Sequence, residues 1–122
     1  MRDSLAIRLG AAACLCVLFG LHNYGVGQPT PRKVEITAKR FEYEPSEITL
    51  KKGEPVLLVV TSQDVSHGLR LRELNVDLKI DKPGGTAEVQ FTPDLVGDFV
   101  GHCSVFCGAS HGSMALTLHV VP

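Results

Sequence analysis

The chain has 122 residues and a formal net charge of −1, with 12 basic side chains against 13 acidic ones. A chain of this length supports one hydrophobic core rather than two. Its charged fraction of 20% and apolar fraction of 44% exclude a disordered tail and a protein that crosses the membrane many times. The near-neutral balance, without any basic run, argues against a nucleic-acid partner.

The first 27 residues have the pattern of an export signal. Two arginines give the segment a positive start, and residues 9–21 are uncharged, which is shorter than the roughly 20 apolar residues of a membrane span. Gly25 and Gly27 place small residues at the positions that a signal peptidase reads, so cleavage is predicted before Gln28. A retained membrane anchor is the alternative, and a membrane association is expected only in that case.

The remaining chain has the pattern of β-structure. Residues 28–32 contain two prolines and are predicted to be a linker before a domain that spans residues 33–122. Alternation of apolar and polar residues predicts strands over residues 34–38, 47–50, 69–72, 76–80, 86–92, 98–100 and 115–120. The apolar run at 55–61 predicts a strand buried on both faces. With turn residues between them and no amphipathic helix, these strands predict an all-β fold, a Greek-key β-sandwich.

The cysteines fall into two groups. Cys14 and Cys16 lie in the predicted signal and would leave with it, whereas Cys103 and Cys107 stay in the mature chain. In an exported protein such a pair is ordinarily a disulfide. A disulfide is therefore the alternative to any metal site built on these two residues.

The segment between the last two predicted strands concentrates side chains that bind metals. It contains Cys103, Cys107, His111 and Met114 in the spacing Cys-x3-Cys-x3-His-x2-Met, and His67 lies upstream. Thiolate, imidazole and thioether donors favour copper over magnesium or calcium. A single-copper electron-transfer site needs one cysteine with two histidines and a weak methionine ligand. The second cysteine therefore indicates a second copper ion.

This motif resembles the copper-A loop of the cupredoxin domains in cytochrome c oxidase subunit II and nitrous-oxide reductase. In that family the upstream histidine follows an Asp-Val pair, as His67 follows Asp64 and Val65 here. The resemblance covers roughly residues 33–122 and implies a cupredoxin-like fold.

The resemblance also implies a set of metal ligands, which are His67, Cys103, Val105, Cys107, His111 and Met114. The two cysteine sulfurs would bridge two copper ions, and each histidine would bind one of them. Met114 and the backbone carbonyl of Val105 would be weak ligands. The oxidase pattern has glutamate at position 105, and because the family uses the main-chain oxygen there, valine retains that ligand.

Two features differ from an oxidase subunit. The chain has at most one short apolar segment where that subunit has transmembrane helices. It also contains no tryptophan, whereas the oxidase family receives electrons from cytochrome c through an aromatic cluster that includes one. We therefore expect an exported electron carrier in the periplasm or another extracytoplasmic compartment, with a cytochrome c or another redox protein as transient partner. The alternatives are a copper chaperone or storage protein and a detached subunit of a respiratory oxidase.

Other residues lie outside the ligand pattern. His102 and His119 are expected at the surface. The acidic stretch at 42–47 is expected to be a solvated loop, with a contact for a basic cytochrome as the alternative. Small residues around His111, together with Phe106, are expected to form a docking surface for the redox partner. Because protein donors fill the expected ligand set, no position is open for a substrate, and bond-making catalysis is not expected.

Overall fold

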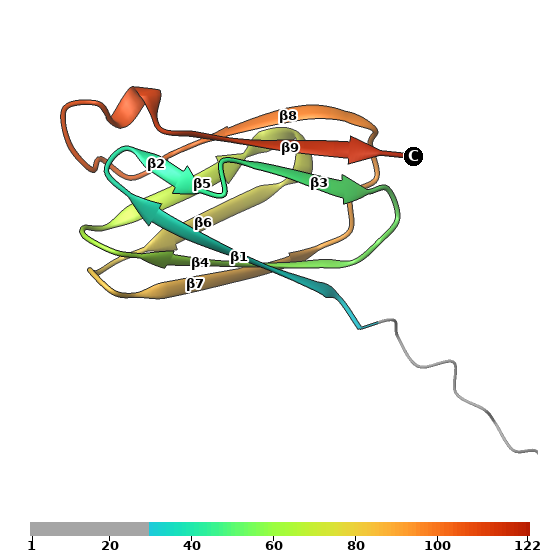
Figure 1. The fold of residues 1–122 in the computed structure, drawn as a ribbon, viewed down its shortest axis with the longest axis horizontal. Coiled ribbons are helices and arrows are strands. Elements are labelled where there is room, and N and C mark those ends of the chain that lie inside the picture. Colours follow the sequence, from blue (N-terminus) through green and yellow to red (C-terminus); the bar gives the residue numbers. More distant parts are fainter. Residues whose placement is uncertain (1–29) are drawn as a thin grey trace, which may run out of the picture.

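The computed structural model describes residues 30–122, which form two β-sheets packed face to face (Figure 1). The strands are β1 (Arg32–Lys39), β2 (Glu42–Glu44), β3 (Glu47–Lys51), β4 (Val56–Ser62), β5 (His67–Leu71), β6 (Val76–Ile80), β7 (Thr86–Phe91), β8 (Gly97–His102) and β9 (Ala115–Val121). One sheet has the order β2-β1-β4-β7 and the other the order β3-β9-β8-β5-β6. The predicted all-β sandwich is confirmed.

The predicted signal at 1–27, with Cys14 and Cys16, lies outside the described residues. Strand β1 begins at Arg32, whose backbone N–H donates to the carbonyl of Pro55 at 2.9 Å. Regular structure thus starts one residue before the expected start of the domain at 33. Within residues 30–122, no helix has the length and apolar character needed to cross a membrane.

The central strand β4 explains how the first sheet is held together. It pairs in parallel with β1 and antiparallel with β7, and its apolar run places Leu58 and Val60 in the core. Val59, on the opposite face, is also buried, so the expectation of burial on both faces is confirmed at this position. A strand with two paired neighbours and two covered faces requires continuous β-branched and aliphatic residues.

The second sheet follows the alternating pattern that the sequence shows. On β9, Leu116, Leu118 and Val120 are buried while the residues between them are partly exposed. Strand β9 pairs in parallel with β3 and antiparallel with β8, so it links the edge strand to the strand that leads into the cysteine segment. The alternating residues therefore anchor β9 in the core, and β9 begins at Ala115, where the cysteine segment ends.

The structure differs from the predicted elements at β2 and at two short 3₁₀ helices. Strand β2 replaces the expected loop: Glu42 and Glu44 are exposed and pair with Lys39 at 3.1 and 3.3 Å, while Tyr43 between them is buried. One apolar residue among charged ones is too short a pattern to identify a strand. The 3₁₀ helices are η1 (Arg72–Leu74) and η2 (His111–Ser113), and η1 ends the predicted strand at 69–72 one residue early.

His119 makes a cross-strand contact that predicts a pH-dependent stability. Its Nδ1 lies 2.6 Å from Asp98 Oδ1 and its Nε2 3.5 Å from Glu47 Oε1, and its side chain is one-third exposed, in agreement with the expected surface position. The hydrogen bond with Asp98, helped by Glu47, raises the pKa of His119 above its ordinary 6.5. Charged His119 therefore stabilises the fold fully below pH 6.5, and this contribution is lost as the pH rises through the raised pKa.

We expect His119→Gln to lower the free energy of unfolding most at about pH 5.5 and least at about pH 9. Urea unfolding of both proteins across that range measures the difference. A difference that stays constant with pH would contradict the assignment to this imidazole.

Candidate metal centre

The cysteine segment lies at one end of the sandwich, between β8 and β9, where η2 also lies (Figure 1). Cys103 follows the last residue of β8, and Met114 precedes the first residue of β9. The backbone N–H of Cys103 donates to the carbonyl of Met114 at 3.2 Å, which continues the ladder between the two strands and closes the base of the loop. His67 reaches the same end from another strand, because it is the first residue of β5.

Three donor side chains meet beneath this loop. The donor atoms of His67, Cys103 and Cys107 all lie within 4.8 Å of one another, and all three residues are buried. The two sulfurs are 3.6 Å apart, and Nδ1 of His67 lies 3.8 Å from the sulfur of Cys103. The structure therefore places the upstream histidine next to the cysteine pair.

The other expected ligands complete the cluster around the two sulfurs. Nδ1 of His111 lies 3.6 Å from the sulfur of Cys107, and Sδ of Met114 lies 3.9 Å from the same sulfur. The carbonyl oxygen of Val105 lies 3.1 Å from the sulfur of Cys103. Each sulfur thus has one imidazole nitrogen and one weak donor beside it. Soft and borderline donors in this arrangement fit copper.

The cysteine pair is present as two free thiols. A disulfide would bring the sulfurs to about 2.05 Å, much closer than the observed separation. Burial raises the pKa of the Cys107 thiol to about 11, and the neighbouring Cys103 contributes in the same direction. In the metal-free chain this thiol keeps its proton at neutral pH, so a bound metal must displace it.

Asp64 holds the imidazole of His67 in one orientation. Its Oδ1 lies 2.6 Å from Nε2 of His67, so with Nε2 as the donor the ring directs an unprotonated Nδ1 at the cysteines. Partial burial by itself would raise the pKa of Asp64. The backbone N–H of Arg40, the His67 ring and the backbone N–H of Val65 outweigh that effect and lower the pKa to about 2.

We expect Asp64→Asn to weaken copper binding by roughly 10- to 100-fold, because an amide does not fix the ring or support its basicity as a carboxylate does. Competition with a chelator of known affinity measures the change. Asp94→Asn, in an exposed loop, is the matched control and should leave the affinity unchanged. Equal affinities in the two variants would show that Asp64 does not position His67.

Two residues from the β1–β2 region support the centre and were not identified from the sequence. The buried hydroxyl of Tyr43 donates to the carbonyl of Gly68, next to His67, and Nε of Arg40 donates to the carbonyl of Cys107 at 2.9 Å. Burial, followed by the nearby Cys103, raises the pKa of Tyr43, so its hydroxyl remains a donor. The sequence signal for this supporting role is weak: Tyr43 is an aromatic residue between two glutamates.

An exposed aromatic ring lies beside the loop. Phe106 is 79% exposed, and its ring centroid lies 5.8 Å from that of His111. His102 is exposed, as expected, and does not belong to the donor cluster. A role of Phe106 in docking stays a prediction.

Comparison with known proteins extends these observations. Residues 30–121 match the family described as cytochrome c oxidase subunit II, periplasmic domain. Cytochrome c oxidase subunit 2 of Thermus thermophilus is 29% identical over 92 residues, which are 75% of this chain and 67% of that protein. Nitrous-oxide reductase of Cupriavidus necator is 35% identical over 85 residues, which are 66% of this chain but only 13% of the reductase.

A solved structure shows the same fold. The periplasmic domain of subunit II of cytochrome oxidase (CoxB) of Bradyrhizobium japonicum superposes with a TM-score of 0.68 at 22% identity, covering 76% of this chain and 86% of that one. The sequence match covers the loop, both flanking strands and the upstream histidine. The chain therefore belongs to the family of the periplasmic domain of cytochrome c oxidase subunit II, a cupredoxin domain of the copper-A type.

Proposed function

We propose that the chain is an electron carrier that holds two copper ions between its two cysteine sulfurs. The observation that carries this proposal is the paired donor set: two sulfurs 3.6 Å apart, each with its own imidazole nitrogen and its own weak donor. A single-copper site needs only one of these sulfurs. Copper held by these residues would supply reversible one-electron exchange.

The protein's contribution is to keep the donors in place. Cys103, Cys107 and Met114 are almost fully buried, and His67 is 0% exposed and oriented by Asp64. Ligands held by packing and hydrogen bonds change position little when the charge of the site changes, which favours rapid electron exchange. Because Val105 offers its carbonyl oxygen, its side chain is free to differ from the glutamate of the oxidase pattern.

The family implies an extracytoplasmic location. We infer that residues 1–27 direct export and are removed before Gln28. A cytochrome c or another small redox protein is the inferred partner. Its approach would be over Phe106 and His111, where an exposed aromatic ring lies beside the most accessible histidine of the donor set.

The experiment that tests this function measures metal content and redox behaviour together. The reduced protein is expected to bind two coppers and to retain both through repeated one-electron oxidation and reduction, followed by spectroscopy and metal analysis. A chaperone or storage protein would instead lose copper on reduction and transfer it to a copper-free acceptor. Binding of a single copper would contradict the two-ion site.

A second candidate, a subunit of a respiratory oxidase, is favoured by the family itself. Under this alternative the domain passes electrons within a membrane complex. Affinity purification of the tagged protein from its host distinguishes the two: a stable complex with haem-containing membrane subunits supports the oxidase subunit, and recovery without them supports the carrier.

A further inference from the structure

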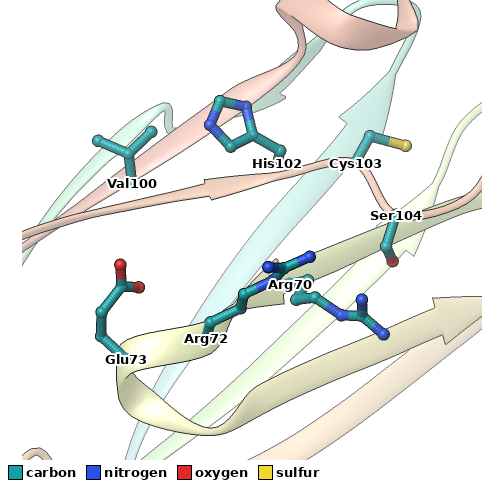
Figure 2. Close-up of a pocket in the computed structure, with 7 residues that line it drawn as sticks. All are labelled: Arg70, Arg72, Glu73, Val100, His102, Cys103 and Ser104. Atoms are coloured by element: carbon teal, nitrogen blue, oxygen red, sulfur yellow. The ribbon is translucent and has the colours of Figure 1, made fainter.

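A pocket with a cavity volume of 410 Å³ lies beside the metal centre, on the side of Cys103 (Figure 2). Strand β5 and helix η1 form one wall with Arg70, Arg72 and Glu73, and the end of β8 forms the other with His102. None of these four side chains is a member of the donor cluster. Cys103 is the one proposed ligand among the lining residues, so the pocket adjoins the metal site while its charged side chains are separate from the donor set.

The charges in the pocket are separated. Figure 2 shows the guanidinium groups of Arg70 and Arg72 on the side of Cys103, and the carboxylate of Glu73 at the opposite end. Within residues 30–122, Arg72 and Glu73 form no ion pair, and Arg70 donates one of its nitrogens, Nη2, to Asp77 at 2.8 Å. The guanidinium of Arg72 and the remaining N–H groups of Arg70 are therefore available to an external acceptor.

A buried hydroxyl group supplies an independent indication of a ligand. Ser104 lines the same pocket, and its Oγ is the buried side-chain oxygen of the described chain that has no hydrogen-bond partner. Leaving such a group unpaired costs about 1–3 kcal/mol, so buried hydroxyls normally have a partner. The hydroxyl lies over Gly68, because a Cβ on that residue would be 2.2 Å from Oγ, so rotation of the Ser104 side chain is needed to bring it to an acceptor in the pocket.

We propose that this arginine pocket binds an oxyanion, a carboxylate or phosphate group, between Arg72, Arg70 and Ser104. Planar guanidinium groups match the paired oxygens of such anions, whereas two cationic side chains repel a metal ion. The ring N–H of His102, at the rim, provides a further donor. The anion is either a free small molecule or the acidic side chain of a partner protein.

Anion binding would place a negative charge next to Cys103. Such a charge stabilises the more positive oxidised form of a redox centre and so lowers its reduction potential. This consequence depends on the proposed function, but the binding site itself does not. The test therefore measures binding in the metal-free protein as well as in the copper-treated one.

The full chain, with thiols reduced, is titrated with sodium phosphate and separately with an aspartate-rich peptide, against sodium chloride at matched ionic strength. Backbone NMR signals of Arg72 and Ser104 are expected to shift saturably with an oxyanion and not with chloride. Arg72→Gln is expected to weaken binding roughly tenfold or more, and Ser104→Ala by a smaller factor. Arg32→Gln, at an exposed position at the start of strand β1, is the matched control and should bind as the parent does.

Saturation by phosphate identifies a free anion as the ligand, and saturation by the peptide alone identifies a partner's carboxylate. The proposal is overturned if neither probe saturates, or if Arg72→Gln binds as tightly as the control. If anion binding is observed but copper is not bound, the proposed function fails while this site stands.

Discussion

Replacing Cys103 with serine is expected to convert a two-copper protein into a one-copper protein. The sulfur of Cys103 lies next to the sulfur of Cys107, the imidazole of His67 and the carbonyl of Val105. A serine hydroxyl is a harder and smaller donor that does not bridge two coppers as a thiolate does. Cys107, with the histidines and the methionine, still provides the donors of a single-copper site.

Metal analysis and electron paramagnetic resonance check this result. The half-oxidised parent should show hyperfine structure from two copper nuclei, and Cys103→Ser should bind one copper and show hyperfine structure from one nucleus. Ser113→Ala, in the same loop but exposed and bonded to Ser110, is the control that should behave as the parent does. Retention of both coppers and of the shared-electron signal by Cys103→Ser would rule out bridging by its sulfur.

Replacing Gly68 with alanine is expected to destabilise the fold by about 1–3 kcal/mol and to weaken copper binding. A Cβ at this position would lie 2.2 Å from Oγ of Ser104, 3.1 Å from Cγ2 of Val105 and 3.1 Å from the carbonyl oxygen of Leu78. The backbone of Leu78 is held in β6, so the side chains of Ser104 and Val105 in the cysteine loop must shift instead. Movement of Ser104 and Val105 displaces the cysteines on either side of them.

Urea unfolding and chelator competition measure the two effects. Gly112→Ala is the matched control, since it lies in the same loop and a Cβ there meets nothing within 4 Å. Because the nearest clash is with the Ser104 hydroxyl, adding Ser104→Ala to Gly68→Ala should recover part of the lost stability. Unchanged stability and affinity in Gly68→Ala would show that the loop does not pack on β5 in this way.

The strands were predictable because their signal is local. Alternation of apolar and polar residues places one face of each strand in the core, and this requirement acts within five to seven residues in β3, β6 and β9. Strand β2 was missed because only one of its three residues, Tyr43, has a largely apolar side chain, and one residue cannot show an alternating pattern. Helix η1 was missed because Arg72 continues the apolar–polar alternation of the sequence one residue beyond Leu71, where β5 ends.

The candidate site was predictable to different extents for its different parts. Cys103, Cys107, His111 and Met114 share one loop, so their spacing alone indicates a common site. His67 lies far upstream and was assigned to the same site from its donor chemistry and the family resemblance, and the structure brings Nδ1 of its ring to 3.8 Å from the sulfur of Cys103. Whether these donors bind two coppers stays a prediction.

By itself, the sequence determined the all-β fold, the core faces of its main strands and the local donor motif, because each depends on residues that are close together in the chain. The tertiary structure alone decided which distant residues support that motif. Asp64, Tyr43 and the arginine pocket reach the site through the pairing and packing of β1, β2, β5 and β8. Such contacts depend on the register between strands and on packing across the two sheets, which no local pattern of residues specifies.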